Sequence, residues 1–270
     1  MPPDQQQILD IMEAAALAAG TAILDIYRQQ FTPRCKADGT PVTLADETAE
    51  KIILNHLAPL NIPVLAEECV ANGIIPKLGN RFFVVDPLDG TKEFVKKNGE
   101  FTVNIALIEN NRPVCGIITV PGLNKGYLGS PKGAFCFDIK EGKSGKKATI
   151  SVAGAGPIKM VVSRSHADPR LRVLREKLGN PTCKNVGSSL KLCMLATGQA
   201  NLYPRFSPTC EWDMAAGEAI LEAAGGIVLS TEHTPLEYGK ISHNFRHPPL
   251  VAAANPRLAL DICNIMSEIG

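Results

Sequence analysis

Residues 82–91 read Phe-Phe-Val-Val-Asp-Pro-Leu-Asp-Gly-Thr, an apolar run followed at once by two carboxylates and a hydroxyl. A short apolar run bounded by turn residues predicts a buried strand, which we expect to end at Asp86. Taken alone, Asp86-Pro87-Leu88-Asp89-Gly90 is typical of a turn. Because its carboxylates leave a buried strand, it also fits a functional site. If Gly90 and Thr91 open a helix, their backbone N–H groups can bind an anion.

Two other acidic segments follow the same design. Glu67 and Glu68 come directly after the apolar run 64–66, which predicts a second buried strand that ends in carboxylates, and Asp213 precedes a helix predicted over 215–224. Each segment alone is more often a solvated strand end or turn. Together they supply oxygen ligands without His or Cys, a set that selects Mg²⁺ or Mn²⁺. Two such ions about 4 Å apart can share one carboxylate and stabilise both the attacking and the leaving oxygens of a phosphoryl displacement.

The remaining periodicity predicts one unit, residues 1–270, built of stacked layers. We expect an α+β front half over 1–139 with the first acidic segments, and an α/β back half over 157–270. Asp4 and Thr43 are the expected N-caps of the first two helices. A charged loop is expected over 140–147. The expected helices are 4–30, 45–57, 169–178, 189–196 and 215–224, and the expected strands are 64–66, 82–85, 101–107, 114–120, 126–128, 134–137, 160–163, 183–186, 200–203 and 227–229.

Composition excludes several classes of function. Lys+Arg 28 against Asp+Glu 27 leaves a net charge of +1, which argues against a nucleic-acid binder, and aromatic residues at 5% with one Trp disfavour a base-stacking platform. The eight cysteines form no Cys-x-x-Cys pair, so we expect reduced thiols. Apolar stretches such as 250–254 fall short of the ~20 residues that a membrane span needs. With no export signal at the N-terminus, we expect a cytoplasmic protein, and leave open peripheral association with the inner face of the membrane and the oligomeric state.

Two segments carry a family resemblance. Residues 86–94, Asp-Pro-Leu-Asp-Gly-Thr-Lys-Glu-Phe, and 211–217, Glu-Trp-Asp-Met-Ala-Ala-Gly, resemble the two signatures of the inositol monophosphatase superfamily of Mg²⁺-dependent, lithium-sensitive phosphatases. Ala66-Glu67-Glu68 resembles its upstream acidic motif. Inositol phosphatases more often carry Asn-Phe where this chain has Glu93-Phe94, and many members have Trp at the position of Phe83. The segments 92–94, 98–107, 163–168, 187–191 and 203–205 resemble the branch of CysQ-type 3′(2′),5′-bisphosphate nucleotidases.

The resemblance implies the layered αβαβα sandwich of the sugar-phosphatase, inositol monophosphatase-like fold. It also implies that Glu67, Asp86 and the carbonyl of Leu88 hold a first Mg²⁺ ion, and that Asp86, Asp89 and Asp213 hold a second. Mn²⁺ is a possible substitute, and the working site would hold two or three ions.

The same resemblance implies the catalytic roles. Thr91 and Asp46 would orient the attacking water and accept its proton. Glu67 and Asp46 would serve a third, more weakly bound ion, the latter through water. This agrees with general chemistry, since a bound cation lowers the pKa of water and a nearby carboxylate can accept the proton.

The implied reaction is hydrolysis of the 3′-phosphate of adenosine 3′,5′-bisphosphate to AMP and phosphate, with 3′-phosphoadenosine 5′-phosphosulfate as a second substrate and a role in sulfate assimilation. The second phosphate needs cations, for which Arg164, His166, Lys191 and Arg205 are candidates, although each alone could be an ordinary surface or capping residue. A helix starting at Ser188 would present Ser188 and Lys191 on one face. The candidate substrate-binding residues are Glu67, Leu88, Asp89, Gly90, Thr91, His166, Ser188, Lys191, Arg205 and Asp213.

Three alternatives remain open at the level of sequence. Within the enzymes, an inositol or sugar monophosphate phosphatase is the second reading. A non-catalytic metal or nucleotide sensor on the same fold would be expected to have lost a metal ligand or Thr91, and this chain retains them. A structural subunit with acidic turns requires three separate acidic motifs to coincide by chance.

Overall fold

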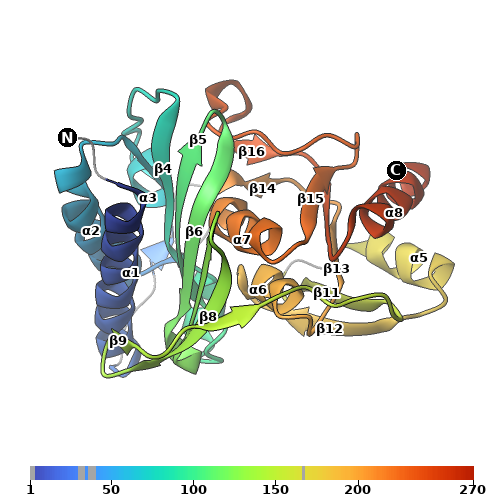
Figure 1. Ribbon diagram of the computed structural model, residues 1–270, viewed down its shortest axis with the longest axis horizontal. Coiled ribbons are helices and arrows are strands. Elements are labelled where there is room, and N and C mark those ends of the chain that lie inside the picture. Colours follow the sequence, from blue (N-terminus) through green and yellow to red (C-terminus); the bar gives the residue numbers. More distant parts are fainter. Residues whose placement is uncertain (1–3, 30–33, 36–40, 166–167) are drawn as a thin grey trace.

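Two β-sheets and their helices stack in five layers in the computed structural model, which describes residues 4–29, 34–35, 41–165 and 168–270 (Figure 1). A pair of helices covers the outer face of the larger sheet, a second pair lies between the two sheets, and a third covers the outer face of the smaller sheet. This order of layers, αβαβα, confirms the fold class predicted from the sequence.

The larger sheet has the strand order β10-β8-β7-β6-β5-β4-β3, with β9 paired to β8. Only β3 and β4 run parallel, and the other pairs are antiparallel. Side chains of β4 alternate between the two faces of the larger sheet. Phe82 and Val84 belong to the core between the sheets, whereas Phe83 and Val85 belong to the core under the outer helices. The strands are β3 (Val64–Ala66), β4 (Arg81–Asp89), β5 (Thr102–Glu109), β6 (Arg112–Val120), β7 (Lys125–Ser130), β8 (Gly133–Lys140), β9 (Lys143–Ser144) and β10 (Ala148–Ile150).

The smaller sheet has the strand order β12-β11-β13-β17-β15. Strand β11 runs parallel to both of its neighbours, and β17 runs antiparallel to both of its own. Its strands are β11 (Lys159–Ser163), β12 (Thr182–Val186), β13 (Leu202–Arg205), β15 (Ile227–Ser230) and β17 (Leu250–Ala253). Two short pairs complete the strands, β1 (Arg34–Cys35) with β2 (Pro41–Val42) and β14 (Thr209–Cys210) with β16 (Arg246–His247).

The helices begin where the sequence provides caps. Asp4 and Thr43 are the N-caps of α1 (Gln5–Tyr27) and α2 (Leu44–Leu57), as predicted. These two helices cover the larger sheet, α6 (Leu190–Ala196) and α7 (Glu211–Ala223) lie between the sheets, and α5 (Pro169–Lys177) and α8 (Pro256–Ile269) cover the smaller sheet (Figure 1). The short helices are α3 (Glu67–Ala71), α4 (Thr91–Val95), η1 (Ala58–Leu60), η2 (Pro121–Leu123) and η3 (Ile241–His243).

Several predicted boundaries were wrong, mostly beside polar residues. Strand β4 continues past Asp86 to Asp89, because its pairing with β5 resumes after an irregularity that accommodates Pro87. Glu67 opens helix α3 rather than ending a strand, and α7 begins at Glu211, where acidic side chains in the first turn suit the helix N-terminus. The predicted loop 140–147 contains the short strand β9, and neither β17 nor α8 was predicted.

Helix α1 corrects the expectation that no apolar stretch approaches the length of a membrane span. By length and composition alone it could cross a membrane, and half of its most apolar window is buried in the structure. Its buried residues, such as Ile8, Met12 and Ile23, pack in the core against α2 and the larger sheet. Buried core helices share this length and composition, so the finding is weak evidence for a span. The seven cysteines whose side chains are described are free thiols.

Candidate active site

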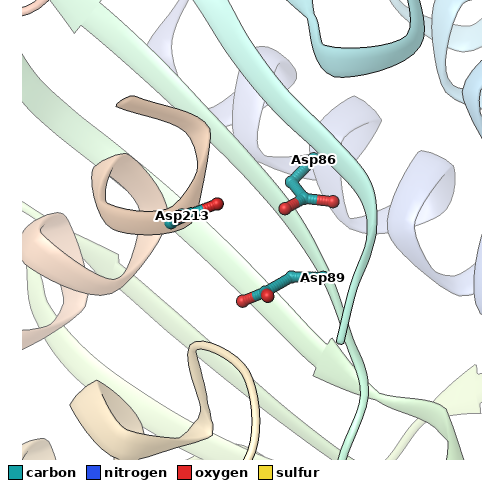
Figure 2. Close-up of side chains that lie close together, drawn as sticks. All are labelled: Asp86, Asp89 and Asp213. Carbon is teal, nitrogen blue, oxygen red and sulfur yellow. The ribbon is translucent and has the colours of Figure 1, made fainter. Parts of the chain in front are cut away.

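A bulge in β4 brings Asp86 and Asp89 to the same side of the sheet. Residues three apart in a regular strand point to opposite faces. Asp86 lies opposite Asn104 on β5 and Asp89 lies opposite Thr102, so β4 advances one residue more than β5 between the two pairs. This extra residue lets both carboxylates point toward the N-terminus of α7, where Asp213 lies (Figure 2).

The three aspartates form a cluster that could hold a metal ion. Asp86, Asp89 and Asp213 each offer one carboxylate oxygen, and these oxygens lie within 4.8 Å of one another (Figure 2). Burial and the neighbouring carboxylate of Asp213 raise the pKa of Asp89 to about 6. A cation would neutralise this repulsion, and an all-oxygen donor set suits a hard divalent cation. The residues present therefore fit the expected metal.

Side chains that the sequence analysis missed hold these carboxylates. The hydroxyl of Ser189 lies 2.6 Å from Asp89 Oδ2 and 2.8 Å from the backbone oxygen of Asp213, and Asn104 donates to that hydroxyl at 2.9 Å. Thr209 donates to Asp213 Oδ2 at 2.5 Å. Ser189 belongs to a segment that the resemblance singled out. Asn104 belongs to another such segment but carried no separate signal, and Thr209 carried none.

Asp46 and Thr91 meet as predicted. Asp46 Oδ2 accepts from the N–H and hydroxyl of Thr43, and Asp46 Oδ1 accepts from the hydroxyl of Thr91 at 3.0 Å. Burial raises the pKa of Asp46, although its hydrogen bonds with Thr43 and Thr91 oppose the shift. Thr91 is the first residue of α4, whose N-cap is Gly90, with a φ of 92° and no side-chain cap. The Thr91 hydroxyl is thus directed to Asp46, and it also lies 3.4 Å from the carbonyl of Leu88.

Most of the predicted site residues line one cavity of ≈ 580 Å³. Asp46 does not line it and lies behind Thr91, in hydrogen-bond contact with the hydroxyl. His166 lies outside the described residues. The predicted residues that line the cavity are Glu67, Asp86, Leu88, Asp89, Gly90, Thr91, Ser188, Lys191, Arg205 and Asp213.

Two of the four candidate cations face this cavity. The ammonium of Lys191, a residue only 5% exposed, donates to the carbonyl of Ser188 and lies 5.3 Å from the centre of the Tyr203 ring. Arg205 donates to the hydroxyl of Tyr203 at 3.2 Å and to the backbone oxygen of Ser207 at 3.2 Å. The prediction that Ser188 and Lys191 share a helix face was wrong, because Ser188 has a φ of 46° and precedes the first helical residue, Leu190.

Arg164 does not line the cavity. Its guanidinium forms an ion pair with Glu100, with Nη2 2.8 Å from Oε1, and donates a second bond from Nε to Oε2 at 3.0 Å. It also donates to the backbone oxygen of Asn185 at 2.9 Å. The guanidinium of Arg164 is thus bound by other residues of the protein, and the structure does not support the expectation that Arg164 binds a second phosphate.

The sequence model of the inositol monophosphatase family matches residues 4–266. The chain belongs to the inositol monophosphatase family. Within it, the chain is 43% identical over 235 residues to the 3′(2′),5′-bisphosphate nucleotidase CysQ of Escherichia coli (strain K12), covering 86% of this chain and 94% of that protein. It is 45% identical over 224 residues to CysQ of Salmonella typhimurium, covering 82% and 89%.

Solved structures agree with this membership. CysQ from Bacteroides thetaiotaomicron, a bacterial member of the inositol monophosphatase family, matches with a TM-score of 0.75 at 38% identity over 91% of this chain and 97% of that one. An inositol monophosphatase from Thermotoga maritima matches with a TM-score of 0.78 at 22% identity over 97% and 99%, a likeness that concerns the fold alone. Family and fold are therefore as the sequence motifs predicted.

Proposed function

We propose that this chain is a cytoplasmic, Mg²⁺-dependent 3′(2′),5′-bisphosphate nucleotidase that hydrolyses adenosine 3′,5′-bisphosphate to AMP and phosphate. The observation that carries the proposal is one cavity lined both by the aspartate cluster and by cationic side chains, among them Lys191 and Arg205. The names of the CysQ relatives support the same substrate.

The aspartate cluster would hold the metal ions. In this proposal Glu67, Asp86 and the carbonyl of Leu88 serve one ion, Asp86, Asp89 and Asp213 serve another, and Asp46 with Glu67 serves a weaker third. When bound, the ions supply charge neutralisation for the phosphoryl group and activation of water. Hard oxygen donors favour Mg²⁺, with Mn²⁺ as a substitute.

Thr91 and Asp46 would carry the proton transfer. Since the Thr91 hydroxyl donates to Asp46 Oδ1, its oxygen lone pairs remain available to accept a hydrogen bond from an attacking water in the cavity. The proton of that water would pass to Thr91 Oγ1 while the Thr91 proton passes to Asp46. The raised pKa of Asp46 makes it a stronger base than an ordinary aspartate.

Lys191 and Arg205 would bind the second anionic group, at the 5′ position. Lys191 is buried and Arg205 is half-buried, both beside Tyr203, and an anion there would gain charge-assisted hydrogen bonds. Inositol 1-phosphate has no second anion to occupy them. The 5′-phosphosulfate of 3′-phosphoadenosine 5′-phosphosulfate does, so this compound is proposed as a second substrate, which connects the enzyme to sulfate assimilation.

The proposal is tested by metal removal and product analysis. Protein stripped with a chelator should release no phosphate from adenosine 3′,5′-bisphosphate until Mg²⁺ is added, and chromatography should then identify AMP as the product. Asp86→Asn is the matched control, because it removes the central charge with little change of shape and should stay inactive after Mg²⁺ is added. Phosphate release by the chelated protein, or removal of the 5′-phosphate instead, would overturn the proposal.

A further inference from the structure

Two carboxylates that come after Asp89 in the chain, those of Glu93 and Glu100, bind segments on the side of the smaller sheet. Ser165 donates its hydroxyl proton to Glu93 Oε1 at 2.5 Å. Arg164 binds both oxygens of Glu100, at 2.8 and 3.0 Å, and the N–H of Gly187 donates to Glu100 Oε2 at 2.7 Å. Glu93 and Glu100 lie on the larger-sheet side, whereas the three donors lie beyond the ends of β11 and β12 in the smaller sheet.

The backbone is also packed closely at this junction. A Cβ atom on Gly187 would lie 2.6 Å from Glu93 Cγ and 2.8 Å from the backbone oxygen of Glu100, so no side chain fits there. A Cβ atom on Gly90 would lie 3.2 Å from Ser188 Cβ. Glu93 is itself only 3% exposed. The contact between these segments is therefore a closely packed interface rather than a pair of flexible surface side chains.

The segments that Glu93 and Glu100 bind form part of the cavity wall. Ser163, Ser165 and Ser188 line the same cavity as the aspartate cluster. The carbonyl of Ser188 accepts a hydrogen bond from the ammonium of Lys191. Glu100 binds the N–H of Gly187, which directly precedes Ser188, so these contacts help to place the segment that leads into Lys191.

We propose that Glu93 and Glu100 form a clamp of positioning residues that sets the spacing between the scissile-phosphate site and the site of the second anion, and so determines the preference for bisphosphorylated substrates. This specificity role rests on the proposed function. Hydrogen bonds made by a carboxylate are stronger than those of a neutral acceptor, which suits residues that hold two layers in register. Asparagine at position 93 is one methylene shorter and could not reach Ser165 without movement of the backbone.

The test uses the full-length protein and two kinds of measurement. Glu93→Asn and Ser165→Ala both break the Glu93–Ser165 hydrogen bond, from opposite sides, whereas Glu93→Gln keeps an acceptor of the same length and should retain a weaker bond. Glu100→Gln weakens the ion pair with Arg164. The matched control is Glu109→Gln, which removes the charge of another carboxylate paired with an arginine, Arg81, at the C-terminal end of β5.

Hydrogen exchange should become about 10-fold faster at residues 163–165 and 187–188 in Glu93→Asn, Ser165→Ala and Glu100→Gln, increase less in Glu93→Gln, and stay unchanged in Glu109→Gln. The KM for adenosine 3′,5′-bisphosphate should rise about 10-fold more than the KM for 4-nitrophenyl phosphate, a small monophosphate. If Glu93→Asn does not fold, Ser165→Ala still gives both readouts.

Unchanged exchange in these segments would overturn the clamp. Faster exchange with equal losses on both substrates would overturn its role in specificity. A parent protein that does not hydrolyse the nucleotide would overturn the proposed function and the specificity role together, whereas the exchange experiment would still decide whether the carboxylates hold the segments.

Discussion

Thr91 is the residue at which a catalytic and a purely structural role are most easily separated. Its hydroxyl donates to Asp46, and no side chain caps α4. Thr91→Ala should therefore lower kcat by roughly 10²–10⁴-fold, the range for a positioned proton transfer, and lower the free energy of unfolding by only about 1 kcal/mol. Calorimetric titration should show Mg²⁺ binding close to that of the parent, and Thr91→Ser should restore turnover. Intact turnover with lost stability would mean that the hydroxyl serves only the fold.

Glu218 is a buried carboxylate on the same helix as Asp213, but it does not line the cavity. It is fully buried on α7, lies 3.0 Å from Arg112 and accepts from the hydroxyl of Tyr238 at 2.5 Å. Burial raises its pKa to about 8, although Arg112 opposes the shift and Glu222 adds to it. The ring of His247, in edge contact with Tyr238, has a pKa that burial lowers to about 4, so it stays neutral across the range from pH 5 to 8.

The pH dependence of stability follows from this shift. A carboxyl group whose pKa is higher in the folded state stabilises the fold below its unfolded pKa of about 4.5 and loses that contribution as pH rises through 8. The free energy of unfolding should thus fall between pH 5 and 8, by up to about 1.4 kcal/mol per pH unit from this group. Glu218→Gln keeps an acceptor for Tyr238 and should remove the fall, as measured by urea denaturation at several pH values. Parallel curves for parent and variant would contradict the assignment.

The residues of the aspartate cluster could be predicted from sequence more completely than their surroundings. Asp86, Asp89 and Asp213 stand in contiguous motifs, and the structure brings them together as a cluster. Ser189 and Thr209 hold these aspartates through contacts that exist only after folding, and the spacing of residues along the chain does not predict such contacts.

At the scale of elements, α7 connects the two sheets and needs a small partner at its contact with β6. A Cβ atom on Gly116 would lie 2.4 Å from the backbone oxygen of Ala216 and 2.9 Å from Ala219 Cβ. Gly116→Ala should cost about 1–3 kcal/mol of stability and also reduce activity, since displacing α7 moves Asp213. Gly154→Ala is the control, because its Cβ would meet no atom within 4 Å. Equal melting temperatures for the two variants would contradict close packing at this contact.

Element prediction succeeded where one periodicity dominated and failed where polar function intervened. Helices α1 and α2 have clear caps and apolar faces, and both were predicted. The bulge in β4 was missed because Pro87 and Gly90 are also what a turn would contain. The short apolar run of β17 was noted only as too short for a membrane span, since periodicity alone does not assign such a run.

At the scale of the whole molecule, one core spans the predicted halves. Val84 of the larger sheet, Ile220 of α7 and Val228 of the smaller sheet belong to the same buried cluster. The sequence predicts that residues 1–270 form one unit, and we therefore expect them to unfold in a single transition. The chain's one Trp, Trp212, lies in this cluster, so its fluorescence and the far-ultraviolet circular dichroism should change together. Separate transitions for 1–139 and 157–270 would indicate two domains.

The central claim, that this member of the inositol monophosphatase family acts on a bisphosphorylated nucleotide, is tested most directly by one comparison. The measurement is kcat/KM for adenosine 3′,5′-bisphosphate and for inositol 1-phosphate, with the same protein at the same Mg²⁺ concentration. Two charge-assisted contacts from Lys191 and Arg205 predict a preference for the nucleotide of about 10²-fold or more. Lys191→Met should reduce that preference about 10-fold, whereas Lys177→Met, on the outer helix α5, should leave it unchanged. An equal or higher kcat/KM for inositol 1-phosphate would contradict the account.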